Sequence, residues 1–254
     1  KYQCYNSFEV TIKNMIPSFL IEKLKNQYGE ELTNKILEGY NQKRKVTLRV
    51  NTIKANINEI QKILDNSNIV YTKVPWSDDA LIIENVREPE ITKLTIYDEG
   101  KIYLQSLSSM LPPIILQPKE NDDILDMAAA PGGKTTQIAS IVNNKARITA
   151  CEMNNIRAEK LKYNIEKQGA NCVYVMVTDS RKIDDFFSFD SILLDAPCSG
   201  SGTLNNNDNK IEKTFTPKLI QKSSKTQAQL LKKAINILKQ GKEMIYSTCS
   251  ILQE

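Results

Sequence analysis

The 254-residue sequence contains no histidine. Hydrolases that rely on a Ser-His-Asp or Cys-His arrangement are therefore excluded, because no imidazole is present to act as the base. Histidine is also a common zinc ligand, and the five cysteines form no C-x-x-C pair. We therefore expect no metal site and no disulfide framework, and we expect reduced thiols in a cytoplasmic compartment.

Long apolar runs are also missing. No stretch approaches the ~18 residues of a membrane span, and the opening KYQCYNSFEV lacks the two regions of a signal peptide. We expect no membrane association. Neither charge dominates, since 34 basic and 30 acidic residues leave a net charge of +4. This mild excess permits a nucleic acid partner without arguing strongly for one.

Glycine is missing where two known nucleotide-binding loops need it. The stretch DILDMAAAPGGKTTQIA, residues 123–139, leads from an apolar strand through a Gly-Gly-Lys-Thr turn into a helix near Lys134. A Walker loop needs a glycine five positions before Gly133, where this chain has Ala128. The dinucleotide fingerprint G-x-G-x-x-G is absent as well. A P-loop NTPase is therefore the weakest interpretation.

From residue 122 onward, predicted strands alternate with predicted helices. The runs DILDM, RITACE, VYVMVTD, FDSILLD and EMIYSTC are typical of buried parallel strands. The helices between them include residues 155–169, stopping at Gly169, and residues 226–241, stopping at Gly241. This pattern predicts right-handed βαβ units in a doubly wound, Rossmann-like α/β sheet.

The first hundred residues predict a smaller α+β module. Its expected parts are a helix over 17–42 broken near Gly29, a strand over 45–52, a helix over 56–68 and a hairpin over 69–83 turning at Ser77-Asp78-Asp79. We place this module at residues 1–105 and the α/β domain at 106–254. Residues 205–225 are predicted to form one long irregular segment.

Basic residues cluster around the first predicted strand. Lys43, Arg44 and Lys45 precede it and Arg49 lies within it. These side chains either contact RNA phosphates or form a solvated charged surface.

Polar residues end the predicted parallel strands, where doubly wound sheets bind ligands. They are Asp126, Glu152, Asp179, Asp195 and Cys249. Glu152 lies 19 residues after Gly133, a spacing at which a carboxylate grips a ribose diol, and Asp179 can accept from an exocyclic amine. The helix after the small-residue turn offers N–H donors to a carboxylate. Amino acid, ribose and adenine together indicate S-adenosylmethionine, although these acids could also merely cap strand ends.

Two cysteines follow adjacent predicted strands, Cys198 in LLDAPCSGSGT and Cys249 in IYSTCS. A buried cysteine is more often a small apolar residue than a nucleophile. However, carbon 5 of a pyrimidine is a poor nucleophile, and thiolate addition at carbon 6 activates it toward an electrophilic methyl group. Two thiols near Asp195 and Lys134 would suit that chemistry.

The motifs LDMAAAPGGKT, LLDAPCSGSGT and STCS, with LRVNT and QSLSSMLPP upstream, resemble the NOL/NOP/Sun (RsmB-type) family of RNA cytosine-5 methyltransferases. The resemblance covers roughly residues 45–254. It implies a class I methyltransferase fold that methylates cytosine in RNA, expected to be ribosomal, through a covalent cysteine adduct. It also implies that the amino-terminal module helps to bind RNA.

The resemblance assigns roles to individual residues. Cys249 would be the nucleophile, Cys198 would assist elimination, and Asp195 and Lys134 would contact the base or tune the thiols. The residues that would hold S-adenosylmethionine are Ala128, Ala129, Ala130, Pro131, Gly132, Gly133, Lys134, Glu152, Asp179 and Asp195.

The chain also departs from the family pattern. It ends at STCSILQE, where the family usually adds two strands that complete a seven-stranded sheet, so we expect carboxyl-terminal strands to be missing. An appended RNA-recognition domain and a basic nucleolar extension are absent from the sequence. We therefore expect a bacterial-type, cytoplasmic monomer, whereas a eukaryotic member would be nucleolar.

Other functions compete with this interpretation. In a DNA cytosine-5 methyltransferase, Cys198 would attack and Cys249 would have no role. A ribosome-assembly factor would bind RNA without catalysis and would not need either thiol.

Overall fold

The computed structural model of the protein describes residues 16–206, 208 and 210–253. The chain divides into two compact units, which we describe separately. The larger unit comprises residues 44–197 and 224–248. The smaller unit draws its described residues from the segment up to 43, from 198–223 and from 249–253.

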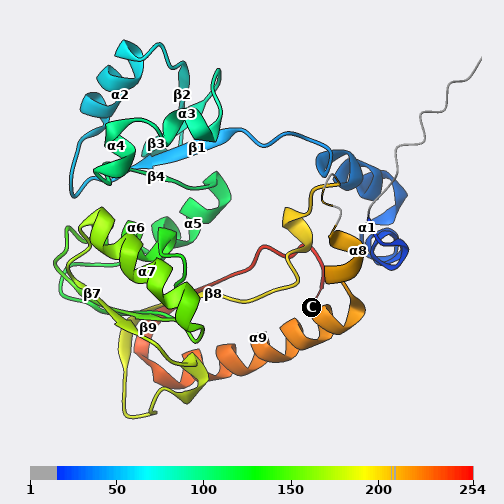
Figure 1. Ribbon diagram of the computed structural model, residues 1–254. Coiled ribbons are helices and arrows are strands. Elements are labelled where there is room, and N and C mark those ends of the chain that lie inside the picture. Colours follow the sequence, from blue (N-terminus) through cyan, green and yellow to red (C-terminus); the bar gives the residue numbers. More distant parts are fainter. Residues whose placement is uncertain (1–15, 207, 209, 254) are drawn as a thin grey trace, which may run out of the picture. The chain divides into compact units, whose positions relative to one another are not determined.

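A four-stranded antiparallel sheet opens the larger unit, with strand order β2-β3-β1-β4 (Figure 1). Its elements follow one another as β1 (Val46–Val50), α2 (Ile57–Asn66), β2 (Tyr71–Val74), β3 (Ser77–Ile83), α3 (Glu88–Ile91), α4 (Thr95–Asp98) and β4 (Ile102–Leu104). Helix α2 begins after Asn56, whose side chain accepts from the Glu59 amide. Its apolar residues Ile60 and Leu64 pack on Leu48 of β1. With the two short helices α3 and α4 taken as one helical connection, the order βαββαβ is that of a ferredoxin-like unit.

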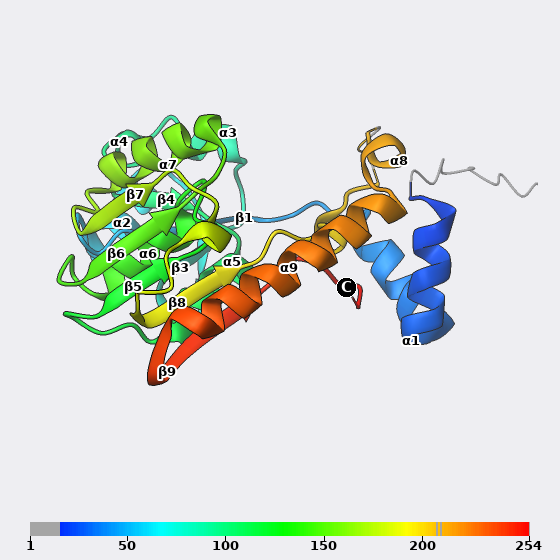
Figure 2. The same ribbon diagram turned by 90° about the horizontal axis from the view of Figure 1, so that it is seen from below.

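Five parallel strands form the second sheet of the larger unit, in the order β7-β6-β5-β8-β9 (Figure 2). This confirms the predicted doubly wound α/β class. The strands are β5 (Asp123–Asp126), β6 (Arg147–Cys151), β7 (Val173–Met176), β8 (Phe189–Asp195) and β9 (Leu238–Ser247). The helices around them are α5 (Leu107–Leu116), α6 (Gly133–Ile141), α7 (Asn155–Gln168) and α9 (Pro217–Ile237).

Alternate side chains of each strand face opposite layers, as the two-residue strand period requires. In β5, Ile124 packs with Leu116 of α5 and Ile138 of α6. Its neighbour Leu125 packs with Leu230 and other residues of the carboxyl-terminal half of α9. The sheet is therefore buried on both faces, which explains why its strands are almost continuously apolar.

The described residues of the smaller unit pack around α1 (Ser18–Gly39) and α8 (Ile211–Thr214). Leu20 and Leu24 of α1 join Phe215 and Ile220 in one apolar cluster. Gly29 breaks the helical geometry with φ 75° and ψ 173°, which confirms the predicted interruption.

Several predicted boundaries were wrong. The hairpin turns at Pro75-Trp76 instead of Ser77-Asp78-Asp79, because Ser77, Asp78 and Asp79 already belong to β3. Helix α9 begins at Pro217, so much of the segment predicted to be irregular is helical. It ends at Ile237, and Gly241 lies inside β9 with φ 75° instead of ending a helix.

Two further points concern predictions about the whole chain. The domain bounds 1–105 and 106–254 stay a prediction. Among the described residues, no helix is both long and apolar enough to cross a bilayer.

Candidate active site

The small-residue turn between β5 and α6 fits closely against its neighbours. Gly132 has φ 108°, and a Cβ there would lie 3.0 Å from Cδ1 of Leu161 in α7. A Cβ on Gly133 would lie 3.1 Å from the Tyr103 ring. Gly132 is favoured by its positive φ, and at both positions an added Cβ would force the neighbouring side chain to shift by a few tenths of an ångström. The turn consequently presents small side chains and main chain to the space in front of it.

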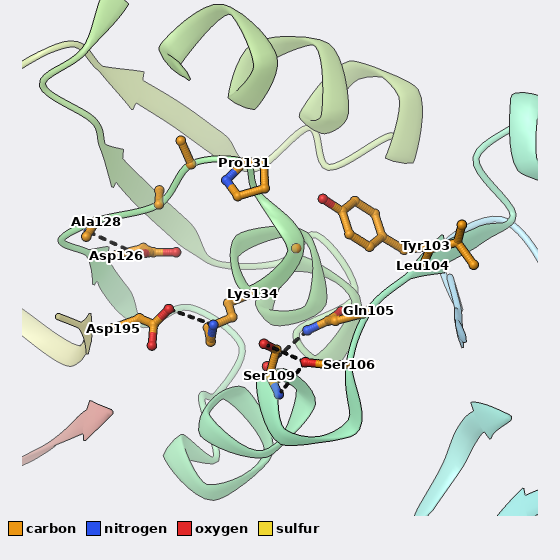
Figure 3. A pocket seen from close by; sticks show the side chains of 13 residues that line it. Tyr103, Leu104, Gln105, Ser106, Ser109, Asp126, Ala128, Pro131, Lys134 and Asp195 are labelled. Carbon is orange, nitrogen blue, oxygen red and sulfur yellow. Dashed lines mark hydrogen bonds and ion pairs between the residues drawn. The ribbon is translucent and has the colours of Figure 1, made fainter. Parts of the chain in front are cut away.

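That space is a cavity of about 240 Å³ in the larger unit. One wall is the turn, another comes from the end of β4 and the start of α5, and the floor comes from the ends of β5 and β8 (Figure 3). The lining residues are Tyr103, Leu104, Gln105, Ser106, Ser109, Asp126, Ala128, Ala129, Ala130, Pro131, Gly133, Lys134 and Asp195.

Lys134 and Asp195 lie side by side in the lining of this cavity, joined by an ion pair (Figure 3). The Lys134 Nζ lies 2.6 Å from Oδ2 of Asp195, and the Ser247 hydroxyl donates to Oδ1 at 2.8 Å. Both Asp195 oxygens are thus held, and the carboxylate is fixed in orientation. Charge-assisted contacts of this kind suit a group that must present one acceptor to a ligand.

Asp126 forms the buried part of the cavity floor, with only 1% of its surface exposed. Burial raises the pKa of its carboxyl group to about 6, and the nearby charge of Asp195 acts in the same direction. The Thr135 hydroxyl donates to Oδ2 at 2.7 Å and opposes this rise. Asp126 can therefore change protonation close to neutral pH.

A second cavity of about 70 Å³ shares Ala128 with the first and reaches Glu152 and Asp179. Glu152 is buried, accepts from the Asn154 amide at 2.8 Å and pairs with Arg157 at 3.2 Å. Asp179 is clamped by Arg181, whose Nη2 lies 2.6 Å from Oδ2. Hydrogen bonds from Arg181 hold the pKa of Asp179 below its usual range, so this carboxylate stays an acceptor.

The donor and acceptor set of the two cavities fits S-adenosylmethionine. Glu152 offers a buried carboxylate for a ribose diol, and Asp179 offers acceptors for an amine, although it shares them with Arg181. The turn lines the first cavity with small residues, Ala128, Ala129, Ala130 and Gly133. An ATP site would instead need phosphate-binding glycines that the turn lacks.

Cys198 and Cys249 meet within the smaller unit, with their Sγ atoms 2.9 Å apart. Their two loops are joined by main-chain and serine contacts: the Gly202 amide donates to the Cys249 carbonyl at 2.9 Å, and the Ile251 amide donates to Ser201 Oγ at 2.9 Å. Cys249 is exposed and Cys198 is half-buried. The sequence prediction of two neighbouring strands before these thiols is confirmed, since β8 and β9 pair in parallel and end at Asp195 and Ser247.

The other described cysteines differ from this pair. Burial raises the pKa of Cys151 to about 12 and also raises the pKa of Cys172. A thiol that ionises so reluctantly is a poor nucleophile. Among the cysteines the structure describes, the accessible, paired thiols are Cys198 and Cys249. Cys4 lies outside the described residues.

The structure distributes the predicted site residues over these features. The first cavity contains Ala128, Ala129, Ala130, Pro131, Gly133, Lys134 and Asp195, and the second contains Ala128, Glu152 and Asp179. Gly132 lines neither of these two cavities and supports the turn from behind. Their roles stay predictions.

Some lining residues were missed by sequence reasoning. Tyr103, Ser106 and Ser109 form a wall of the first cavity. Tyr103 lies in β4, and the motif QSLSSMLPP that contains the two serines has no spacing that points to a ligand. Arg157 and Arg181 were missed although their partners Glu152 and Asp179 were predicted, because no motif marks an arginine that follows such a carboxylate by five or two residues.

Arg49 corrects a different prediction. We expected it as one of four candidate phosphate contacts, but its side chain is 1% exposed and donates to Gln105 and Thr136. An arginine enclosed in this way cannot reach an RNA phosphate on the surface. Lys43, Arg44 and Lys45 are exposed, so contact with RNA phosphates stays a prediction for those three only.

Comparison with known families matches residues 113–254 to the model described as 16S rRNA methyltransferase RsmB/F. Residues 16–88 match the ferredoxin-like domain of RsmF/B-like methyltransferases. The chain is 37% identical over 216 residues to ribosomal RNA small subunit methyltransferase F of Aliivibrio salmonicida, covering 82% of this chain and 45% of that protein. The chain thus spans less than half the length of this curated relative.

Two solved structures from Pyrococcus horikoshii are also similar to this chain over most of its length. A methyltransferase homolog protein from Pyrococcus horikoshii superposes with a TM-score of 0.78 at 31% identity, covering 93% of this chain and 78% of that chain. The structure of NSun6 from Pyrococcus horikoshii with SFG superposes with a TM-score of 0.84 at 25% identity, covering 94% and 84%.

Proposed function

Because the chain belongs to the RsmB/F family of 16S rRNA methyltransferases, we propose that it methylates carbon 5 of a cytosine in ribosomal RNA through a covalent cysteine adduct. The methyl donor in this proposal is S-adenosylmethionine. One observation carries it above the others: Cys198 and Cys249 lie with their sulfur atoms 2.9 Å apart. A non-catalytic RNA-binding protein would have no use for two accessible thiols in contact.

Cys249 is the proposed nucleophile because it is the more exposed of the two thiols. Its thiolate adds to carbon 6 of cytosine, and the electron pair of the carbon 5–carbon 6 double bond becomes available at carbon 5. Carbon 5 then forms its bond to the methyl group as the methyl–sulfur bond of the donor breaks, and the donor sulfur leaves with that electron pair. When the carbon 5 proton leaves to a base, the double bond re-forms and the bond from Sγ to carbon 6 breaks, which returns the thiolate.

Cys198 is proposed to assist this elimination, since it is the thiol next to the departing sulfur. Lys134 and Asp195 are proposed to contact the base or to tune the thiols. The 2.6 Å ion pair and the hydrogen bond from Ser247 fix the orientation of the Asp195 carboxylate. The carboxylate can then accept a hydrogen bond from an N–H group of the cytosine.

S-Adenosylmethionine, when bound, supplies an electrophilic methyl group. The residues proposed to hold it are the turn 128–134, Glu152, Asp179 and Asp195. The buried Glu152 would orient the ribose and Asp179 the adenine amine, while the turn would leave room for the amino acid part.

The amino-terminal module, proposed at residues 1–105, would help to bind the RNA. Lys43, Arg44 and Lys45 are exposed there and would contact phosphates. The cytoplasmic location and the monomeric state expected from the sequence stay predictions.

The direct test is methyl transfer from labelled S-adenosylmethionine to a 16S rRNA transcript, to 30S subunits and to duplex DNA, with the product nucleoside identified by mass spectrometry. We expect 5-methylcytidine in RNA only. A matched control is Cys172→Ser, which alters a half-buried thiol outside the pair and should keep the activity. Methylation of DNA, or of another RNA atom, would contradict the proposal.

The cofactor has a separate test by calorimetry. The protein should bind S-adenosylmethionine and not ATP, and Glu152→Ala should weaken that binding by removing the carboxylate proposed to hold the ribose. Binding of ATP in the same range, unaffected by Glu152→Ala, would overturn the assignment.

A further inference from the structure

A basic groove lies on the larger unit beside the second cavity. It measures about 480 Å³ and lies along η1 (Ser180–Lys182) and one face of α9. The residues that line it are Asp179, Arg181, Lys182, Gln229, Lys232, Lys233 and Asn236. The α9 residues recur at intervals of three and four, so they share one side of the helix.

Two of the four cations in this groove are already paired. Arg181 is bound to Asp179, and Lys233 contacts Asp185 and donates to the Ile183 carbonyl at 2.8 Å. Lys182 and Lys232 are exposed and make no ion pair with any residue that the structure describes. The groove therefore keeps two positive charges that its own acids do not balance, which suits a polyanion.

An exposed aromatic residue, Phe186, follows Lys182 by four residues in the chain, with Asp184 and Asp185 just before it. The Phe186 side chain is 98% exposed, and Phe187 is 52% exposed. The ion pair between Asp185 and Lys233 fastens this loop to the α9 wall of the groove. A phenylalanine so fully exposed contributes nothing to the core. Aromatic rings beside cations are the combination that binds single-stranded nucleic acid, with bases stacked and phosphates paired.

The cofactor does not explain these charges. Asp179 and Arg181 line both the groove and the second cavity, but S-adenosylmethionine carries no phosphate for Lys182 and Lys232 to bind. We propose that the groove, with Phe186 beside it, binds a single-stranded stretch of the RNA substrate. Phosphates lie against Lys182 and Lys232, and one base stacks on Phe186. The inference rests on the proposed function only for the identity of the RNA.

The test compares Lys182→Ala/Lys232→Ala with Lys119→Ala/Lys160→Ala, which removes the same charge from exposed lysines outside the groove. The probe is fluorescein-labelled oligouridylate, titrated over a range of salt concentrations. Two lost phosphate contacts should reduce the slope of log affinity against log salt by about 1.4 and weaken binding roughly 25-fold near ~0.1 M salt. The control pair should change both quantities far less.

Phe186→Ala supplies a second, independent measurement. It should weaken oligouridylate binding about fivefold or more without changing the salt slope, because stacking releases no counterions. Phe186→Trp should restore the affinity, and its fluorescence should be quenched by the probe. Two results would overturn the proposal in favour of a surface that binds any anion. One is an equal loss of oligouridylate affinity in Lys182→Ala/Lys232→Ala and in the control Lys119→Ala/Lys160→Ala. The other is a loss of polyglutamate affinity in Lys182→Ala/Lys232→Ala as large as its loss of oligouridylate affinity.

Methylation of a 16S rRNA transcript separates this inference from the proposed function. If the groove exists as described, the groove pair should raise KM and leave kcat near that of the unsubstituted chain. If Lys182→Ala/Lys232→Ala methylates the transcript with an unchanged KM, the groove proposal is contradicted and the proposed function is not. If the unsubstituted chain binds oligouridylate through the groove but methylates no RNA, the proposed function is contradicted and the groove proposal is not.

Discussion

At Asp126 the fold holds a carboxyl group where its charge is costly. The residue is 1% exposed, and burial raises its pKa from 3.8 to about 6. The protonated form is therefore the one that the fold favours. The contribution of Asp126 to stability is fully present below about pH 3.8 and is lost as the pH rises through about 6.

Asp126→Asn should remove this pH dependence, since the amide is neutral and similar in shape. Relative to the unsubstituted chain, its free energy of unfolding should rise by up to about 3 kcal/mol between roughly pH 4 and pH 7. Urea unfolding of both proteins across that window measures the difference. Because Asp126 lines the proposed cofactor cavity, the stabilised variant should bind S-adenosylmethionine more weakly.

Asp123→Asn is the matched control, at the other end of the same strand. A hydrogen bond from Arg147 lowers the pKa of Asp123, so its contribution is present at neutral pH and lost as the pH falls. The two variants should thus change stability with opposite signs at neutral pH. Parallel pH curves for Asp126→Asn and the unsubstituted chain would contradict the account of Asp126.

The residue scale also shows where sequence reasoning stops. The spacing of Asp126, Glu152 and Asp195 after apolar runs was enough to place them at strand ends, because strand alternation fixes those positions. Two of their partners could not be predicted, since Ser247 reaches Asp195 through the pairing of β8 with β9 and Arg157 reaches Glu152 from the first turn of α7. Arg49 shows the same limit, because a charge within a strand gives no sign that it will be buried.

At the scale of the elements, the turn into α6 depends on Gly132. Gly132→Ala would place a Cβ 3.0 Å from Leu161 at a φ of 108°, so it should lower the free energy of unfolding by about 1–3 kcal/mol and weaken cofactor binding. Gly39→Ala, at the end of α1 with no atom within 4 Å of the added Cβ, should be nearly neutral. Calorimetry with S-adenosylmethionine and urea unfolding measure both effects. Equal behaviour of the two variants would show that the turn is more tolerant than its geometry indicates.

Elements with strong periodicity were predicted well, and those defined by context were not. Helix α7 has apolar residues at helical spacing and a stop at Gly169, whose φ of 68° explains that stop. Helix α5 escaped prediction because Pro112 and Pro113 lie inside it, and consecutive prolines are unusual in a helix. The first nine residues of α9 were predicted to be loop because their polar side chains hide the helical period.

At the scale of the whole molecule, the chain passes between its two units four times, and two of these crossings separate the strand ends from the thiols. Asp195 and Ser247 end β8 and β9 in the larger unit, whereas Cys198 and Cys249 belong to the smaller one. Because a sequence pattern follows the order of residues along the chain, it predicted one continuous domain from residue 106. Grouping segments that are distant in sequence requires contacts that no linear pattern contains.

The central claim is that Cys249 attacks the base and Cys198 releases it, and trapping the adduct tests this most directly. The measurement uses labelled S-adenosylmethionine, a 16S rRNA transcript and denaturing electrophoresis. We expect Cys198→Ser to accumulate a labelled protein–RNA adduct, because addition proceeds and elimination stalls. Cys249→Ser and the double variant should form none, since a hydroxyl ionises far less than a thiol near neutral pH. An adduct that persists in Cys249→Ser and vanishes in Cys198→Ser would contradict the account and reverse the two roles.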